Sequence, residues 1–318
     1  MIENLAMSTT WNSRRQENVP EMLYEISQLG LHCIEAGYKL TPAQIGQLVD
    51  LQSEIEFRTV SVHNFCPIPV GHECGWGDDF LLSSPDEEMR KSGVNAVLQT
   101  ISLAEKLGAG VVVIHLGKVE AGREQHIRLK QLAAAGCRNT TEFIENVNEM
   151  KAQRNSKAGV YFDAARRTLD DLLPKLPKGI FLGLENRYEF YSIPIIPEME
   201  RLLKEYGKGI GYWHDMGHAH VQEFMGFCET GEHLAKLGTR LAGMHIHDAI
   251  GISDHMPPGS GEIDFGSIIP YINMDIPKVL ELHPRVTWEE AKKGVEFLSF
   301  SALSSRCPLR STFDLSDR

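Results

Sequence analysis

Eight short apolar segments recur along the 318-residue chain, and each ends at or beside a polar residue. Segments with helical patterning separate most of them, for example 19–30, 94–108 and 165–176. Strands that alternate with helices are typical of βαβ units and a parallel sheet, and eight such units favour a closed barrel over an open sheet. We therefore expect an α/β fold, a single (β/α)8 TIM-barrel domain over 1–318, with strands within 3–9, 32–37, 57–63, 110–115, 179–185, 209–215, 241–247 and 278–283.

The chain is longer than the ~250 residues typical of such a barrel, and most of the surplus lies between the fourth and fifth strands. Residues 118–160 are predicted to form a helical insertion there. From Lys118 to Arg167 there are ten Lys or Arg residues and six Asp or Glu residues, a local basic excess in an acidic chain. Residues from about 304 to 318 form a C-terminal tail.

Composition narrows the classes of partner. The formal net charge of −11 argues against nucleic acid or an anionic membrane surface, because phosphate binding needs clustered Lys and Arg. No apolar stretch approaches the ~18 residues of a membrane span, and the first residues have no signal-peptide pattern. The six cysteines form no CxxC pair, which fits a reducing compartment. We expect a cytoplasmic protein and leave open whether it forms a homo-oligomer.

Side-chain direction can be predicted along each strand. Alternate residues face opposite sides, and in a barrel these sides face the helices and the interior. Assigning branched aliphatic residues, such as Val60 and Val62, to the helix side leaves an inward ionisable residue at the carboxyl end of strands three to eight. These residues are His63, His115, Glu185, Asp215, His245 and Glu281.

Six ionisable side chains at one mouth of a barrel would be costly to desolvate unless something satisfied them. The carboxyl ends of the strands are also where barrel enzymes carry their active sites. Carboxylates and imidazoles at short range suit a divalent ion such as zinc, manganese, cobalt or magnesium. We therefore predict one bound divalent metal ion at this mouth and leave a second open.

The stretch "GIGYWHDMGHAHV", residues 209–221, concentrates such groups. Asp215 ends the sixth strand facing inward, and His218, three residues later, is expected to curl over the same mouth. His214 has the opposite parity and is assigned a structural role. His220 and His247 are assigned structural roles as well.

Five spans, "LGLEN", "HDMGH", "GMHIHD", "DHMPPGSGEIDF" and "ELHP", resemble in order the xylose isomerase-like barrel superfamily. That group includes sugar and sugar-phosphate isomerases and epimerases, and the endonuclease IV type of abasic-site nuclease. The resemblance runs from about Ile2 to the helix after Pro284. For the epimerase branch it implies a metal ion held by Glu185, Asp215, His245 and Glu281. The two glutamates would also serve as catalytic acid and base, with His218 as a helper.

For the nuclease branch, the resemblance implies three zinc ions and a larger ligand set. This chain matches it at His63, His115, Glu185, Asp215, His218, His245, His255 and Glu281. The nuclease pattern has an aspartate two residues before the histidine that matches His255, whereas this chain has Ser253 there and Asp254 one residue later. The loop instead resembles the isomerase-like members, which puts the third ion in doubt.

Further residues at the mouth are candidates for binding substrate. His63, His115, His218 and His255 would contact substrate or a second metal ion. Glu35 ends the second strand with inward parity and would bind a substrate hydroxyl. Arg187 follows Glu185 by two residues and would reach an anionic group or form a surface ion pair.

The expected function is a metal-dependent isomerase or epimerase of a sugar, sugar phosphate or related polyol. It would abstract a proton next to a carbonyl and pass through an enediolate, with a small carbohydrate as its partner. The alternatives are an endonuclease IV-like phosphodiesterase, an inosose-type dehydratase and a barrel that binds sugar without catalysis. Metal stoichiometry separates the phosphodiesterase from the isomerase, and an activity unaffected by Glu185→Gln would favour the binding protein.

Overall fold

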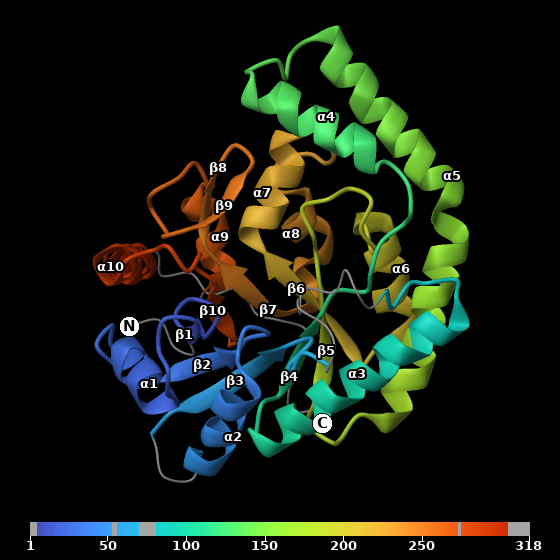
Figure 1. Ribbon diagram of the computed structural model, residues 1–318. Helices are drawn as coiled ribbons and strands as arrows, with labels where there is room; N and C mark the ends of the chain where they lie inside the picture. Colours follow the sequence, from blue (N-terminus) through green and yellow to red (C-terminus); the bar gives the residue numbers. More distant parts are fainter. Residues whose placement is uncertain (1–4, 53–55, 70–80, 273–274, 305–318) are drawn as a thin grey trace.

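Eight parallel strands close into a barrel in the computed structural model, which describes residues 5–52, 56–69, 81–272 and 275–304 (Figure 1). The order around the barrel is β1-β10-β7-β6-β5-β4-β3-β2. Each barrel strand lies within a predicted range, so the (β/α)8 prediction is confirmed. The barrel strands are β1 (Leu5–Ser8), β2 (Cys33–Ala36), β3 (Arg58–His63), β4 (Val111–Ile114), β5 (Phe181–Glu185), β6 (Ile210–Asp215), β7 (Leu241–Ile246) and β10 (Lys278–Leu280). Strands β8 (Asp248–Ile250) and β9 (Ser253–Met256) form a separate antiparallel hairpin.

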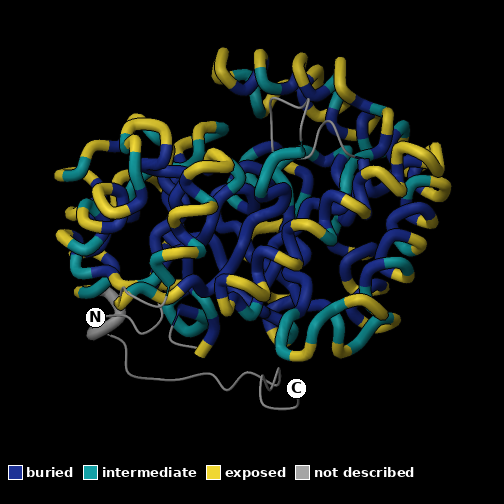
Figure 2. Tube along the Cα trace, turned by 60° about the horizontal axis from the view of Figure 1, so that its bottom comes forward, coloured by how far each residue is buried: buried dark blue, intermediate teal, exposed yellow. Residues whose placement is uncertain are grey.

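Helices surround the strands, and local sequence signals mark where several begin. Asn18, Thr41 and Asp86 each cap a helix by accepting backbone N–H groups. Buried residues concentrate in the strands, and exposed residues lie on the outer helices (Figure 2). The helices are α1 (Val19–Ser27), α2 (Pro42–Leu51), α3 (Glu87–Lys106), α6 (Ile196–Tyr206), α7 (Met216–Phe224), α8 (Glu232–Leu237), α9 (Phe265–Ile272) and α10 (Trp288–Ser304).

Two further helices, α4 (Arg123–Ala134) and α5 (Thr141–Leu172), follow β4 and contain most of the stretch predicted as an insertion. Helix α5 is 32 residues long and continues past residue 160. Its second half, including Phe162 and Leu169, packs in the main barrel core. Its first half packs with α4 in a separate cluster through Phe143 and Met150. The second part of the insertion and the helix that covers the barrel after β4 therefore form one continuous helix, α5.

In the described ranges, no helix has both the length and the apolar character needed to cross a membrane. The described residues end at 304, so the predicted C-terminal tail from residue 305 onward lies outside them.

A small apolar cluster fills the barrel interior on the amino-terminal side of the mouth. Trp213 is its largest member and is completely buried. A Cβ on Gly243 would lie 2.1 Å from the Trp213 ring, so glycine at 243 makes room for the indole. The cluster contains Ala6, Val60, Val111, Val113, Phe181, Trp213, Ala242 and Val279.

The prediction that Val60 faces the helices is wrong, because Val60 packs inside the barrel. The pairing of β2 with β3 shifts register between Ile34 and Glu35, so Val60 is an extra residue in a β-bulge. Val62 lies in the helix-side core as predicted. The shift pairs Ser61 with Glu35, which matters for the site described next.

Candidate functional site

Four side chains meet at the carboxyl ends of β5, β6, β7 and β10. Glu185 and Asp215 end their strands, His245 is next to last in β7, and Glu281 follows β10. One ligand atom from each lies within 4.8 Å of the others, and all four residues are buried. The fold therefore brings together the four residues that the sequence predicts as metal ligands.

His245 lies at the centre of this group. Its Nδ1 is 3.2 Å from Glu281 Oε2 and 3.5 Å from Asp215 Oδ2, and 3.6 Å from Glu185 Oε1. Ligand atoms about 2.1 Å from a tetrahedral ion are about 3.4 Å apart, so these separations suit one shared ion. His245 Nδ1 and Glu185 Oε1 are buried and have no hydrogen-bond partner within the described part of the chain. Unpaired buried polar atoms are costly, so the donor set fits a divalent ion.

Glu35 holds His245 from the opposite side. Its Oε2 accepts hydrogen bonds from His245 Nε2 at 3.2 Å and from Ser61 Oγ at 2.8 Å. With the proton on Nε2, a neutral His245 carries its lone pair on Nδ1, facing the three carboxylates. Glu35 is fully buried. Its position favours support of His245 over the predicted contact with a substrate hydroxyl.

Asp215 is held by two residues that the sequence analysis did not assign to the site. The Asn186 side chain donates to the Asp215 carbonyl at 3.0 Å and accepts from its N–H at 2.9 Å. His247 Nδ1 accepts the backbone N–H of His255 at 2.9 Å, which puts the proton of a neutral His247 on Nε2. That Nε2 lies 3.0 Å from Asp215 Oδ1. The side chain predicted as structural therefore orients a candidate ligand, as outer-shell partners of metal sites do.

A second group of potential metal ligands includes the other carboxylate oxygen of Glu185. Glu185 Oε2 lies 2.7 Å from His115 Nε2 and 3.2 Å from His63 Nε2. His63 Nδ1 donates to the carbonyl of Asn64 at 2.9 Å, so a neutral His63 turns a lone pair toward Glu185. Burial and the charge of Arg187 lower the pKa of His115. Glu185, His63 and His115 form a second group of potential ligands.

A third group lies at the β8–β9 hairpin and consists of His218, Asp254 and His255. His218 Nδ1 is 3.2 Å from Glu185 Oε1 and bonds to the carbonyl of Asn186 at 3.0 Å. Its Nε2 is 3.8 Å from Asp254 Oδ2. His255 adopts a left-handed backbone conformation, with φ 57°, and its Nδ1 donates to the Glu281 carbonyl. The nuclease pattern has an aspartate at the position of Ser253; in this chain the neighbouring Asp254 supplies the carboxylate of the group.

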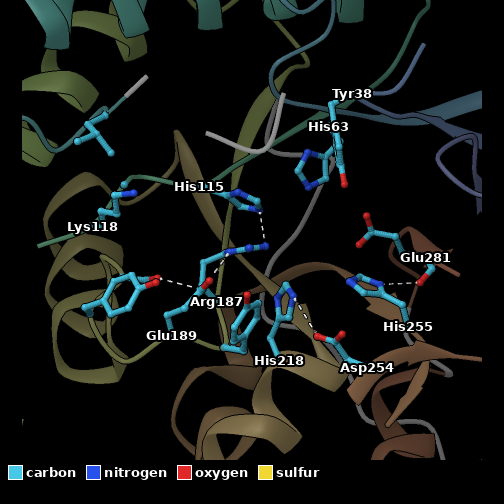
Figure 3. Close-up of a pocket in the computed structure, with 15 residues that line it drawn as sticks. Tyr38, His63, His115, Lys118, Arg187, Glu189, His218, Asp254, His255 and Glu281 are labelled. Carbon is cyan, nitrogen blue, oxygen red and sulfur yellow. Dashed lines mark hydrogen bonds and ion pairs between the residues drawn. The ribbon is translucent and has the colours of Figure 1, made fainter. Parts of the chain in front are cut away.

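A cavity of about 470 Å³ opens over these groups, a volume typical of small-molecule sites. Figure 3 shows His63, His115, His218, His255 and Glu281 around it, together with Arg187. Tyr38, Lys118 and Glu189 also line the cavity, and the sequence analysis did not predict them because they lie on loops. His214 and His220 line a different cavity beside α7.

The electrostatics keep two of the candidate carboxylate ligands ionised. Burial opposes ionisation of Glu281, but His245, His255 and His63 lower its pKa to about 2. Burial also opposes ionisation of Asp215, yet His218 and His247 hold its pKa well below the usual range. Both side chains are therefore carboxylates at neutral pH, the form that binds metal ions.

Comparison with known proteins agrees with this description. A family model for the xylose isomerase-like TIM barrel matches residues 23–299. An uncharacterized protein, y4fM of Sinorhizobium fredii (strain NBRC 101917 / NGR234), is 24% identical over 248 residues, 73% of this chain and 68% of that protein.

Two solved structures are similar in fold. One is an L-ribulose 3-epimerase, with 18% identity, 96% of each chain covered and a TM-score of 0.64. The other is the IOLI protein with a bound zinc atom, with 15% identity, 96% of this chain and 100% of that chain covered, and a TM-score of 0.61. At these identities the similarity extends to the fold alone.

Proposed function

The chain belongs to the xylose isomerase-like TIM barrel family, and we propose that it is a divalent-metal-dependent isomerase or epimerase of a sugar, sugar phosphate or related polyol. One observation carries the proposal: uncommitted buried atoms of Glu185 and His245 converge with carboxylates at the base of the pocket. The pocket volume of about 470 Å³ suits a small carbohydrate. The fold similarity to an L-ribulose 3-epimerase and to a zinc-containing barrel gives further support.

Glu185, Asp215, His245 and Glu281 would hold the ion, and zinc, manganese, cobalt and magnesium all accept such mixed ligands. When bound, the ion would act as a Lewis acid on the substrate carbonyl and so acidify the neighbouring C–H. Glu35 and His247 would keep the imidazole and carboxylate ligands in orientation through the hydrogen bonds described above.

Two glutamates are the proposed acid and base. Glu281 lines the pocket as a carboxylate and would take the proton from the carbon beside the carbonyl, leaving an enediolate. Glu185 lies deeper, but it contacts His115 and His63, which both line the pocket. These imidazoles give Glu185 a route for proton exchange with the pocket. Return of a proton to the opposite face gives the epimer, and return to the neighbouring carbon gives the isomer.

Deuterium exchange tests the proposal. The protein, loaded in turn with zinc, manganese, cobalt and magnesium, is incubated in heavy water with a panel of ketoses, ketose phosphates and inososes, and the carbon-bound protons are followed by NMR. We expect at least one substrate to exchange, and Glu281→Gln and Glu185→Gln to abolish the exchange. Absence of exchange over the whole panel with every ion would overturn the proposal. Loss of water from an inosose would instead identify a dehydratase.

A second candidate function is a metal-dependent phosphodiesterase. The third group, His218, Asp254 and His255, supports it, because together with the other two groups it offers ligands for more than one ion. Clamping of a phosphoryl group by several ions is a known route to phosphodiester hydrolysis. Elemental analysis decides: one ion per chain would remove this candidate, whereas three ions with cleavage of a phosphodiester would favour it.

A further inference from the structure

Arg187 places a guanidinium in the pocket whose hydrogen-bonding capacity is largely unused. Its side chain is only 19% exposed. Nη1 lies 3.2 Å from His115 Nε2. The nearest carboxylate oxygens are beyond hydrogen-bond reach, at 3.9 Å for Glu185 and 3.8 Å for Glu189. A guanidinium has five N–H donors, and across the described ranges this one makes no other side-chain hydrogen bond. Arg187 lines the pocket, so its remaining N–H groups can donate to an anionic ligand bound there.

The backbone of Arg187 is held by a hydrogen bond from α7, and its guanidinium contacts His115. Gln222 of α7 donates its side-chain amide to the Arg187 carbonyl at 2.5 Å. The same Gln222 is oriented by His233, whose Nε2 lies 3.2 Å from its Oε1. In Figure 3 the Arg187 side chain extends toward the middle of the pocket, below His115.

Lys118 supplies a second cation on the same side of the pocket. Its backbone N–H and carbonyl both bond to the Ser83 hydroxyl at 2.9 Å, and it pairs with Ser192 in an isolated bridge. Gly117, with φ 112°, permits this approach, because a Cβ there would lie 2.4 Å from Ser83 Oγ. The Lys118 loop is therefore held at the edge of the pocket.

Charge is segregated along the pocket. Figure 3 shows Lys118 and Arg187 on one side and Glu281 and Asp254 on the other. Among the labelled residues, Glu189 is the carboxylate on the cationic side, 3.8 Å from Arg187 Nε. Arg187 Nη1 lies 3.9 Å from Glu185 Oε1, so the guanidinium borders the proposed metal site, and Lys118 lies on the other side of Arg187 from Glu281 (Figure 3).

We propose that Arg187 and Lys118 form an anion subsite beside the proposed metal site, and that the substrate carries an oxyanion, either a phosphate monoester or a carboxylate. This inference rests on the proposed function. Arginine recognises both anions through the same paired N–H donors, and Lys118 adds a point charge. The subsite thus selects charged substrates over neutral sugars of the same length.

Calorimetric titration of the metal-loaded protein tests the subsite, with inorganic phosphate and acetate as separate probes. We compare wild type with Arg187→Lys, Arg187→Met and the control Arg128→Met, an exposed arginine paired with Glu142. Loss of charge-assisted hydrogen bonds should weaken the preferred anion by about 10- to 100-fold in Arg187→Met and by a smaller factor in Arg187→Lys. Arg128→Met should match wild type. Stronger binding of phosphate indicates a phosphate ester, and stronger binding of acetate indicates a carboxylate.

Two results would overturn the subsite. One is absence of saturable binding of either anion to wild type. The other is equal affinity in wild type and a folded Arg187→Met, because the metal ion alone would then bind the anion. Should Arg187→Met not fold, Arg187→Lys decides, since a lysine cannot reproduce the two-pronged contact.

Substrate turnover separates failure of the subsite from failure of the proposed function. In the exchange assay we expect ketose phosphates or keto-acid sugars to react, with KM raised in Arg187→Lys by about the factor by which this variant weakens the anion, and kcat changed less. Exchange confined to neutral ketoses, with KM unaffected in Arg187→Lys, would contradict the anion subsite and still support the isomerase. Anion binding that depends on Arg187, without exchange on any substrate, would support the subsite and contradict the isomerase.

Discussion

Substitution of Glu35 should weaken metal binding although Glu35 is not a proposed ligand. Glu35 Oε2 accepts hydrogen bonds from His245 and Ser61, and the first of these keeps the lone pair of a neutral His245 on Nδ1. In Glu35→Gln the amide can turn its NH₂ toward His245 Nε2. The proton of the imidazole would then move to Nδ1 and block the atom that faces Glu281 and Asp215. Glu35→Ala removes the acceptor altogether.

The size of the effect follows from what is lost. Partners that orient a metal-binding histidine typically contribute 10- to 100-fold to metal affinity, which is about 1.4 to 2.7 kcal/mol. Because one of the two hydrogen bonds at Oε2 can survive in Glu35→Gln, we expect roughly tenfold weaker zinc binding there. Glu35→Ala leaves His245 free to rotate, so its loss should approach ~100-fold.

Competition against a chromophoric chelator measures the zinc affinity, and ¹⁵N NMR of the imidazoles reports which nitrogen of His245 carries the proton. Glu198→Gln is the matched control, because Glu198 is also buried but pairs with Arg154 at 2.5 Å, away from the mouth. This control should lower the Tm and leave zinc affinity unchanged. Wild-type zinc affinity in both Glu35 variants, with His245 protonated on Nε2 throughout, would refute the reasoning.

Three further outcomes are expected. Gly243→Ala forces a methyl group to within 2.1 Å of the Trp213 ring, so denaturant titration should show a loss of about 1–3 kcal/mol in the free energy of unfolding; unchanged stability would mean that the indole has room to move. Burial lowers the pKa of His233 from 6.5 to about 4, so the unfolded chain binds a proton first on acidification and stability falls from pH 6.5 toward pH 4. Unfolding at pH 7 and pH 5 should show His233→Gln losing about 2 kcal/mol less than wild type on this change of pH, and equal losses would count against the assignment. If the third group binds an ion, Asp254→Asn should lower the number of zinc ions per chain in elemental analysis, whereas an unaltered count would leave Asp254 without a metal.

The strands and the residues at the mouth could be predicted from the sequence because both depend on a period of two. That parity holds in β5 and β6, and in β7 it holds from Gly243 to His245, beyond a register shift at Ala242, so Glu185, Asp215 and His245 were placed correctly beside one another. Parity fails wherever an extra residue enters a strand, as Val60 does in β3, and a bulge has no signature in a single sequence. The same prediction placed Glu35 inward but could not show that His245 lies against it.

The loops were beyond prediction for a different reason. Asp254 reaches His218 because the β8–β9 hairpin folds over the mouth, and neither the turn nor its register follows from hydrophobic pattern. Lys118 and Tyr38 likewise reach the pocket only through the path of their loops. The sequence thus predicted the pocket residues at the ends of the barrel strands, but not those that reach the pocket from loops.

Glu185 presents Oε1 to His245 and Oε2 to His63 and His115. A carboxylate shared in this way makes the two groups of potential metal ligands interdependent. An ion bound at one oxygen withdraws electron density from the carboxylate and so makes the other oxygen a weaker metal ligand. Occupancy of the two positions should therefore be coupled, and neither can be redesigned at Glu185 without disturbing its neighbour.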